Sequence, residues 1–123
     1  MPVPILKQGD VLIASVQSAL TDQDLLQLRD ELATKVGRFR SLGAIIDVTA
    51  LDVMDSFATR TLRSLAAVTR LKGAETVIVG IQPEVAIALV QLGLSLEGVA
   101  TALDLEEGLD MLAALREARR SDG

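Results

Sequence analysis

Residues 43–47 of the chain read Gly43-Ala44-Ile45-Ile46-Asp47, an almost continuous apolar run that ends in a carboxylate. Such a run is typical of a β-strand that is buried on both faces, as in a parallel sheet covered by helices. A second run of the same character occupies residues 76–80, with the sequence TVIVG. The two runs predict central strands of a sheet, and Asp47 is expected at the carboxyl end of the first strand.

Helical periodicity appears on both sides of residues 43–47. Upstream, apolar residues recur at helical spacing between a capping pair, Thr21 and Asp24, and Gly37. Downstream, a helix is expected from Ser56 to Leu71, with Gly73 as its stop. The side chains expected to face the core from this second helix are Phe57, Leu62, Leu65, Ala66 and Thr69.

The ends of the chain complete the pattern. Two β-prone runs at residues 2–6 and 11–16, joined by a turn-forming cluster, predict an opening hairpin. A third helix is expected to begin at Pro83 and end at Gly93, followed by a short strand near residues 98–102. The buried face expected for the third helix comprises Val85, Ala88, Leu89 and Leu92.

The last helix is expected to begin at a capping pair, Asp104 and Glu107, and to end near Ala118. The order of elements predicts an α/β fold with a mixed β-sheet, opened by a hairpin and covered by about four helices. Residues 1–118 are expected to form a single domain. Residues 119–123 have no apolar anchor and are expected to fray.

Composition excludes several classes of function. The chain has 123 residues with neither His nor Cys, which excludes Ser-His-Asp triads, thiolate nucleophiles and zinc-thiolate sites. The net charge is −5 and the only aromatic residues are two Phe, so neither nucleic acid nor an anionic membrane is an expected partner. The longest uncharged stretch, residues 85–96, is too short to span a membrane. We therefore expect an unprocessed cytoplasmic protein.

The mean hydropathy of +0.40 is high for a soluble domain of this size. A domain of about 120 residues leaves roughly a third of its unfolded surface exposed, so an excess of apolar residues must partly lie on the surface. This composition favours self-assembly or a permanent protein partner.

The segment after residue 47 contains three aspartates and a serine, and three interpretations of it are open. In the first, Ser56 is an ordinary N-cap and the aspartates are solvated. In the second, Asp47, Asp52 and Asp55 form a Mg²⁺ site, because hard cations prefer carboxylate oxygens. In the third, Ser56 is an exposed phosphate acceptor at the junction of a loop and a helix, where an anion is tolerated.

Charge changes sign at this junction. Residues 42–55 contain only acidic charges, whereas residues 56–74 contain Arg60, Arg63, Arg70 and Lys72 and no acid. Arg60 and Arg63 are three residues apart and share a helix face. That face is either solvated or a receptor for an acidic partner.

Four stretches of the chain resemble a known family. Met54-Asp55-Ser56-Phe57, residues 79–86, Leu92-Gly93-Leu94 and residues 101–109 are similar to the STAS domains, and within them to the RsbS-type scaffold proteins of the bacterial stressosome. The similarity extends over nearly the whole chain. It implies the SpoIIAA-like STAS fold, a scaffolding role without enzymatic activity, and no cofactor or metal.

The resemblance also implies a set of partners and a modification. Ser56 would be phosphorylated by a serine kinase of the RsbT type, which the scaffold sequesters and then releases, and a phosphatase of the RsbX type would reverse the reaction. The other expected partner is an RsbR-like STAS paralogue, in homo- and hetero-oligomers. The residues expected to contact partners are Asp52, Asp55, Phe57, Thr59, Arg60 and Arg63.

Two departures from related patterns place the chain within the family. Antagonists of anti-sigma factors of the SpoIIAA type follow the Asp-Ser pair with Ser-Gly-Leu, whereas Phe57-Ala58 follows here. RsbR-like proteins carry a threonine where this chain has Ala88. A monomeric anti-sigma-factor antagonist regulated by serine phosphorylation is therefore the second hypothesis, and a small enzyme with an acidic site is the third.

Overall fold

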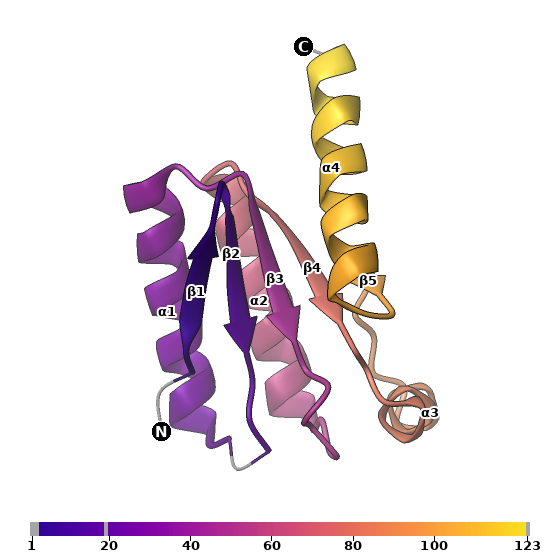
Figure 1. The fold of residues 1–123 in the computed structure, drawn as a ribbon. Helices are drawn as coiled ribbons and strands as arrows, with labels where there is room; N and C mark the ends of the chain where they lie inside the picture. Colours follow the sequence, from indigo (N-terminus) through magenta and orange to yellow (C-terminus); the bar gives the residue numbers. More distant parts are fainter. Residues whose placement is uncertain (1–2, 19, 123) are drawn as a thin grey trace.

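The computed structural model describes residues 3–18 and 20–122, which form one five-stranded mixed sheet with four helices (Figure 1). The strands lie in the order β1-β2-β3-β4-β5, with β1 antiparallel to β2 and all other pairs parallel. The strands are β1 Ile5–Gln8, β2 Val11–Ser15, β3 Gly43–Asp47, β4 Glu75–Val79 and β5 Ala100–Ala102. The helices are α1 Asp22–Phe39, α2 Ser56–Leu71, α3 Pro83–Gln91 and α4 Leu105–Asp122. The predicted fold class is confirmed.

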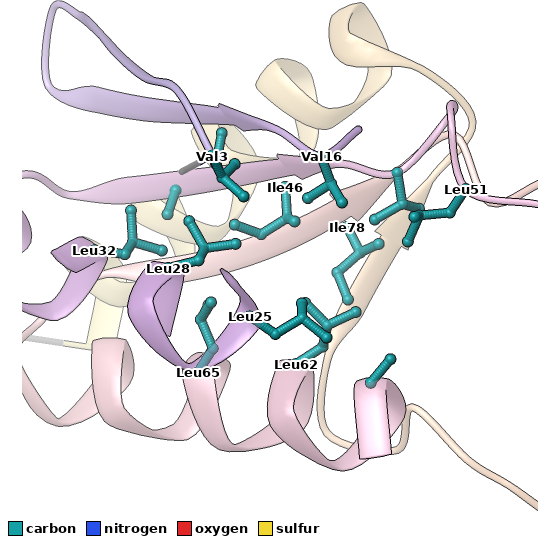
Figure 2. Packing of buried hydrophobic residues seen from close by; sticks show 14 of the residues in the cluster. Val3, Val16, Leu25, Leu28, Leu32, Ile46, Leu51, Leu62, Leu65 and Ile78 are labelled. Atoms are coloured by element: carbon teal, nitrogen blue, oxygen red, sulfur yellow. The ribbon is translucent and has the colours of Figure 1, made fainter. Parts of the chain in front are cut away.

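The central strands separate two hydrophobic cores. One core lies between the sheet and the helices α1 and α2, where Ile46 and Ile78 meet Leu28 and Leu62 (Figure 2). The other lies under α4, which packs against the opposite face of the sheet (Figure 1). Because successive side chains of a strand point to opposite faces, each central strand supplies both cores, and this explains its continuous apolar sequence.

Helix α4 approaches the sheet closely at two glycines. Leu112 is 1% exposed and anchors the second core. A Cβ atom added to Gly43 would lie 2.8 Å from Cδ1 of Leu112. Because glycine has no side chain, that space is free for the Leu112 side chain. A Cβ atom added to Gly108 would likewise lie too close to Val79, so this glycine also allows α4 to lie against the sheet.

The capping pair at the start of α1 forms as predicted. The Thr21 hydroxyl accepts the Asp24 backbone N–H at 3.1 Å, and the Asp24 carboxylate accepts the Thr21 backbone N–H at 3.1 Å. The backbone hydrogen bond from Thr21 is the main cause that lowers the pKa of Asp24. The helix passes the predicted stop at Gly37 and ends at Phe39, because Arg40 adopts the left-handed conformation that closes it.

Two apolar elements differ from the sequence-based expectations. Strand β1 begins at Ile5, later than predicted, and residue 2 lies outside the described residues. Leu92 is 67% exposed, because α3 ends at Gln91 and the chain turns at Leu92 and Gly93. Leu94, two residues further on, packs against the main core instead.

The expected end of the last helix was wrong. Helix α4 continues to Asp122, beyond Ala118. Arg119 donates a hydrogen bond to the carbonyl oxygen of Gly73 at 3.3 Å and lies 3.9 Å from the Glu75 carboxylate. A polar anchor thus replaces the apolar anchor that this segment lacks. None of the helices within the described residues is long and apolar enough to cross a membrane.

Two helical glycines offer a test of the close packing of α4. At Gly37 an added Cβ would meet only the Lys72 ammonium, at 3.5 Å, so Gly37→Ala should raise the free energy of unfolding by about 0.5–1 kcal/mol. At Gly108 the Cβ would lie 2.7 Å from Cγ1 of the buried Val79, so Gly108→Ala should lower it by about 1 kcal/mol or more. Urea unfolding measures both variants, and equal stabilisation by both would contradict this packing.

Candidate functional site

The loop between β3 and α2 is held to the molecule by a buried apolar side chain at every third position. Val48, Leu51 and Met54 are 1%, 5% and 4% exposed and belong to the main core. Asp52, between Leu51 and Met54, and Asp55, directly after Met54, are exposed. The loop therefore presents its carboxylates to solvent from a backbone that the core fixes in place.

Asp55, and not Ser56, is the N-cap of α2. The Asp55 carboxylate accepts the backbone N–H of Ala58 at 2.8 Å, and Asp55 has the extended backbone of a cap. Ser56 is the first residue of the helix, and it is exposed. Its hydroxyl makes no hydrogen bond with any residue that the structure describes. The N-cap interpretation of Ser56 is thus corrected, and the hydroxyl is accessible from solvent.

Two of the residues expected to contact partners face inward. The Thr59 side chain is 1% exposed, and its hydroxyl donates to the carbonyl oxygen of Asp55 at 2.9 Å. It cannot touch a partner directly, which corrects that expectation, and its effect is to hold the cap residue in place. Phe57 is half-buried and packs against the main core. The rotation of α2 about its own axis determines that both side chains, Phe57 and Thr59, point toward the core.

The start of the loop after β3 is held by hydrogen bonds within it and by the close approach of a second loop, the one after β4. The backbone N–H and the hydroxyl of Thr49 both donate to the Asp47 carboxylate, at 2.9 and 2.6 Å. Gly80 lies directly beside them with φ of +80°, and a Cβ at Gly80 would lie 2.0 Å from the Thr49 hydroxyl oxygen. Only glycine satisfies both the backbone angle and the close approach.

Gln82 joins the two loops. Its side-chain amide nitrogen donates to the carbonyl oxygen of Thr49 at 2.7 Å and to the Asp52 carboxylate at 3.3 Å. The three carboxylates of the loop therefore accept hydrogen bonds from three different residues: Asp47 from Thr49, Asp52 from Gln82 and Asp55 from Ala58. Among the residues for which positions are described, no three acidic groups gather as metal ligands would. The arrangement does not support the magnesium interpretation.

Arg60 and Arg63 are exposed on α2, as the sequence predicts. Together with Arg70 they border a hollow between α2 and the loop before β5. The sequence reasoning missed Thr49, Gly80 and Gln82 as parts of the site. A short Asp47-Val48-Thr49 pattern is typical of a side-chain-bonded turn and could have indicated the first contact. No local signal could show that Gln82 reaches Asp52, 30 residues earlier.

The sequence profile of the STAS domain matches residues 3–108. The chain belongs to the STAS domain family. This STAS domain is 41% identical to a serine-to-glutamate variant of RsbS from Moorella thermoacetica, whose structure superposes with a TM-score of 0.80 over 94% of this chain and 97% of that one. It is 42% identical to a chain in a solved structure that describes the molecular architecture of the stressosome. That chain superposes with a TM-score of 0.77 over 92% of this chain and 98% of its own length.

More distant relatives share parts of this similarity. The RsbT co-antagonist protein RsbRA of Bacillus subtilis is 25% identical over 107 residues, which are 87% of this chain and 38% of RsbRA. The STAS domain thus spans well under half the length of the curated relatives it matches. The anti-sigma factor antagonist SpoIIAA is 14% identical with a TM-score of 0.64, a likeness of fold alone.

The different parts played by Asp55 and Ser56 can be separated by stability measurements. Asp55→Ala removes the cap of α2 and should lower the free energy of unfolding by about 1 kcal/mol, whereas Asp55→Asn should cost less because Asn also caps helices. Ser56→Ala removes no contact and should change stability by less than about 0.5 kcal/mol. Thermal unfolding checks all three, and a larger loss for Ser56→Ala than for Asp55→Ala would contradict the assignment of the cap.

Proposed function

We propose that this STAS domain is a non-enzymatic scaffold of a bacterial stressosome, which binds a serine kinase of the RsbT type and releases it when Ser56 is phosphorylated. The similarity to RsbS and to a stressosome chain, above 40% identity over more than nine-tenths of each chain, supports the role. The observation that carries the proposal is the exposed hydroxyl of Ser56, at the first residue of α2 and without a hydrogen-bond partner among the described residues.

The surroundings of Ser56 suit a phosphate acceptor. A kinase transfers the γ-phosphoryl group of ATP to the hydroxyl oxygen, and ADP and the hydroxyl proton leave. The attacking oxygen must be accessible and must not be engaged elsewhere, and Ser56 meets both conditions. The cap contact of Asp55 and the bridge from Gln82 keep the preceding loop in one conformation, so the kinase meets a preorganised surface.

Local charge supplies the switch. A phosphate group on Ser56 adds about −1.5 to −2 charges at pH 7, next to the exposed carboxylates of Asp52 and Asp55. In the free protein the group lies on the surface, and no hydrogen bond within the described residues depends on the Ser56 hydroxyl that carries it. Across an interface with a bound kinase the charges cannot move apart, and like charges there cost several kcal/mol. Phosphorylation therefore acts on binding much more than on folding.

Exposed apolar side chains support assembly with STAS paralogues. Val53, Leu71, Val90 and Leu103 are each at least 75% exposed. An interface that covers such side chains would remove their apolar area from water, which favours association. We infer homo- and hetero-oligomers with an RsbR-like paralogue in the cytoplasm, and a phosphatase of the RsbX type that removes the phosphate.

The scaffold role is better supported than direct antagonism of an anti-sigma factor. Identity to RsbS is 41%, against 14% to SpoIIAA. The residues after Ser56 are Phe57 and Ala58 in place of a Ser-Gly-Leu sequence, and the half-buried Phe57 packs against the main core.

Phosphorylation of the chain should be confined mainly to Ser56. Incubation with its RsbT-type kinase and ATP, followed by mass spectrometry, should place the phosphate on Ser56, and Ser56→Ala should reduce incorporation at least tenfold. Ser64→Ala, on the same helix and partly buried, is the matched control and should be phosphorylated normally. Unchanged incorporation in a folded Ser56→Ala variant would show that another residue is the acceptor.

Phosphorylation should weaken kinase binding without unfolding the scaffold. We expect the affinity for the kinase to fall a hundredfold or more, which corresponds to about 3 kcal/mol. The melting temperature should shift by only a few degrees, because the group is exposed in the free protein. Calorimetry and binding titrations on the fully phosphorylated and unmodified chains test both statements. A collapse of the melting temperature, or an unchanged affinity, would disprove the mechanism.

A further inference from the structure

The outward face of α2 carries three arginines in one line. Arg60, Arg63 and Arg70 are separated by three and seven residues, and this spacing places them on one stripe of the helix. Helix α2 has no acidic residue from Ser56 to Leu71, so no carboxylate of the same helix neutralises them. In a chain of net charge −5 this stripe is a local concentration of positive charge.

The stripe borders a hollow of about 350 Å³ between α2 and the loop that leads from α3 to β5. Small side chains of α2, Ser64 and Ala67, lie between the arginines and leave the space open. The opposite wall is formed by residues 97–99. A volume of this size lies within the range of small-molecule sites, which is about 300–1,000 Å³.

The three arginines differ in their contacts. Arg70 donates to the carbonyl oxygen of Gly98 at 3.2 Å and to the Glu75 carboxylate at 3.4 Å, so it fastens the opposite wall to α2. Arg60 and Arg63 are exposed, and neither guanidinium forms an ion pair or a hydrogen bond within the described part of the chain. Two guanidinium groups one turn apart thus border the hollow without a partner among the described residues.

We propose that this hollow is a binding site for a phosphomonoester, with Arg60 and Arg63 as its donors. A guanidinium presents two parallel N–H groups that match two phosphate oxygens. A phosphomonoester carries nearly two negative charges at pH 7 and neutralises both arginines, whereas one carboxylate would neutralise only one. Glu97 is the one carboxylate among the residues that line the hollow, and it lowers the affinity by repulsion.

The phosphate has two sources with the same chemistry. One is a phosphorylated small molecule from solution. The other is the chain itself, because Ser56 precedes Arg60 by four residues, the spacing at which side chains on a helix meet. If the chain itself is the source, the phosphate that the proposed function places on Ser56 would fill the site. The arginine site does not depend on that function, because Arg60 and Arg63 border the hollow in the unmodified chain.

Binding of O-phospho-L-serine to the unmodified chain tests the site. At constant ionic strength, the arginine side-chain NMR signals of Arg60 and Arg63 should shift and saturate. The double variant Arg60→Gln/Arg63→Gln should weaken binding about tenfold or more, because charge-assisted hydrogen bonds are lost. Glu97→Gln should tighten binding several-fold, a change opposite in sign that a purely structural role would not give. Arg38→Gln, an exposed arginine of α1, is the matched control and should bind as the unmodified chain does.

A chain made with phosphoserine incorporated at position 56 during synthesis distinguishes the two sources. If its own phosphate fills the site, the Arg60 signal is shifted without ligand and added O-phospho-L-serine binds at least tenfold more weakly. If the added ligand binds equally well to both chains, the ligand comes from solution. No saturable shift of Arg60 or Arg63 in either chain, or shifts that the double variant leaves unchanged, would overturn the site. Because no kinase is used, these outcomes are independent of whether a kinase modifies Ser56.

Discussion

The burial of the central strands on both faces is the constraint on which the rest of the structure depends. Ile45 and Ile46 are neighbours in β3, both are 0% exposed, and they belong to different cores. One face therefore needs α1 and α2, and the other needs α4 (Figure 1). With β2, β3 and β4 parallel, their carboxyl ends open at one edge of the sheet, and the loops after β3 and β4 must meet there. The contact between Gln82 and Thr49 follows from this geometry.

The sequence predicted the elements that repeat a simple physical rule, and it did not predict contacts that depend on distant parts of the chain. Helix α2 was placed from Ser56 to Leu71 because its apolar spacing is regular. One of the three open interpretations of Ser56 placed the cap of α2 one residue too late, because Asp and Ser are almost equally good caps and stand side by side. The inward orientation of Thr59 depends on the phase of the packed helix, which sequence spacing alone left open.

The end of α4 illustrates the same limit. A search for apolar anchors finds none after Ala118, yet Arg119 contacts Gly73 and Glu75, more than 40 residues away in the sequence. Long charged side chains can fasten a helix through polar contacts while their stems lie along the surface. Such anchors leave no periodic signal, because only one residue in several turns is involved.

The assignment of the cap to Asp55 explains how a modification at the start of a helix can leave the helix intact. If the Ser56 hydroxyl capped α2, phosphorylation would remove the contact that begins the helix, and the fold and the switch would change together. Here the Asp55 carboxylate makes that contact without the Ser56 hydroxyl, and the Thr59 hydroxyl donates to the Asp55 carbonyl oxygen. The serine is thus the one polar side chain at this junction with no structural duty among the described contacts. Under the proposed function, a charge placed on Ser56 would therefore act on a partner bound at this surface and not on the contacts that begin the helix.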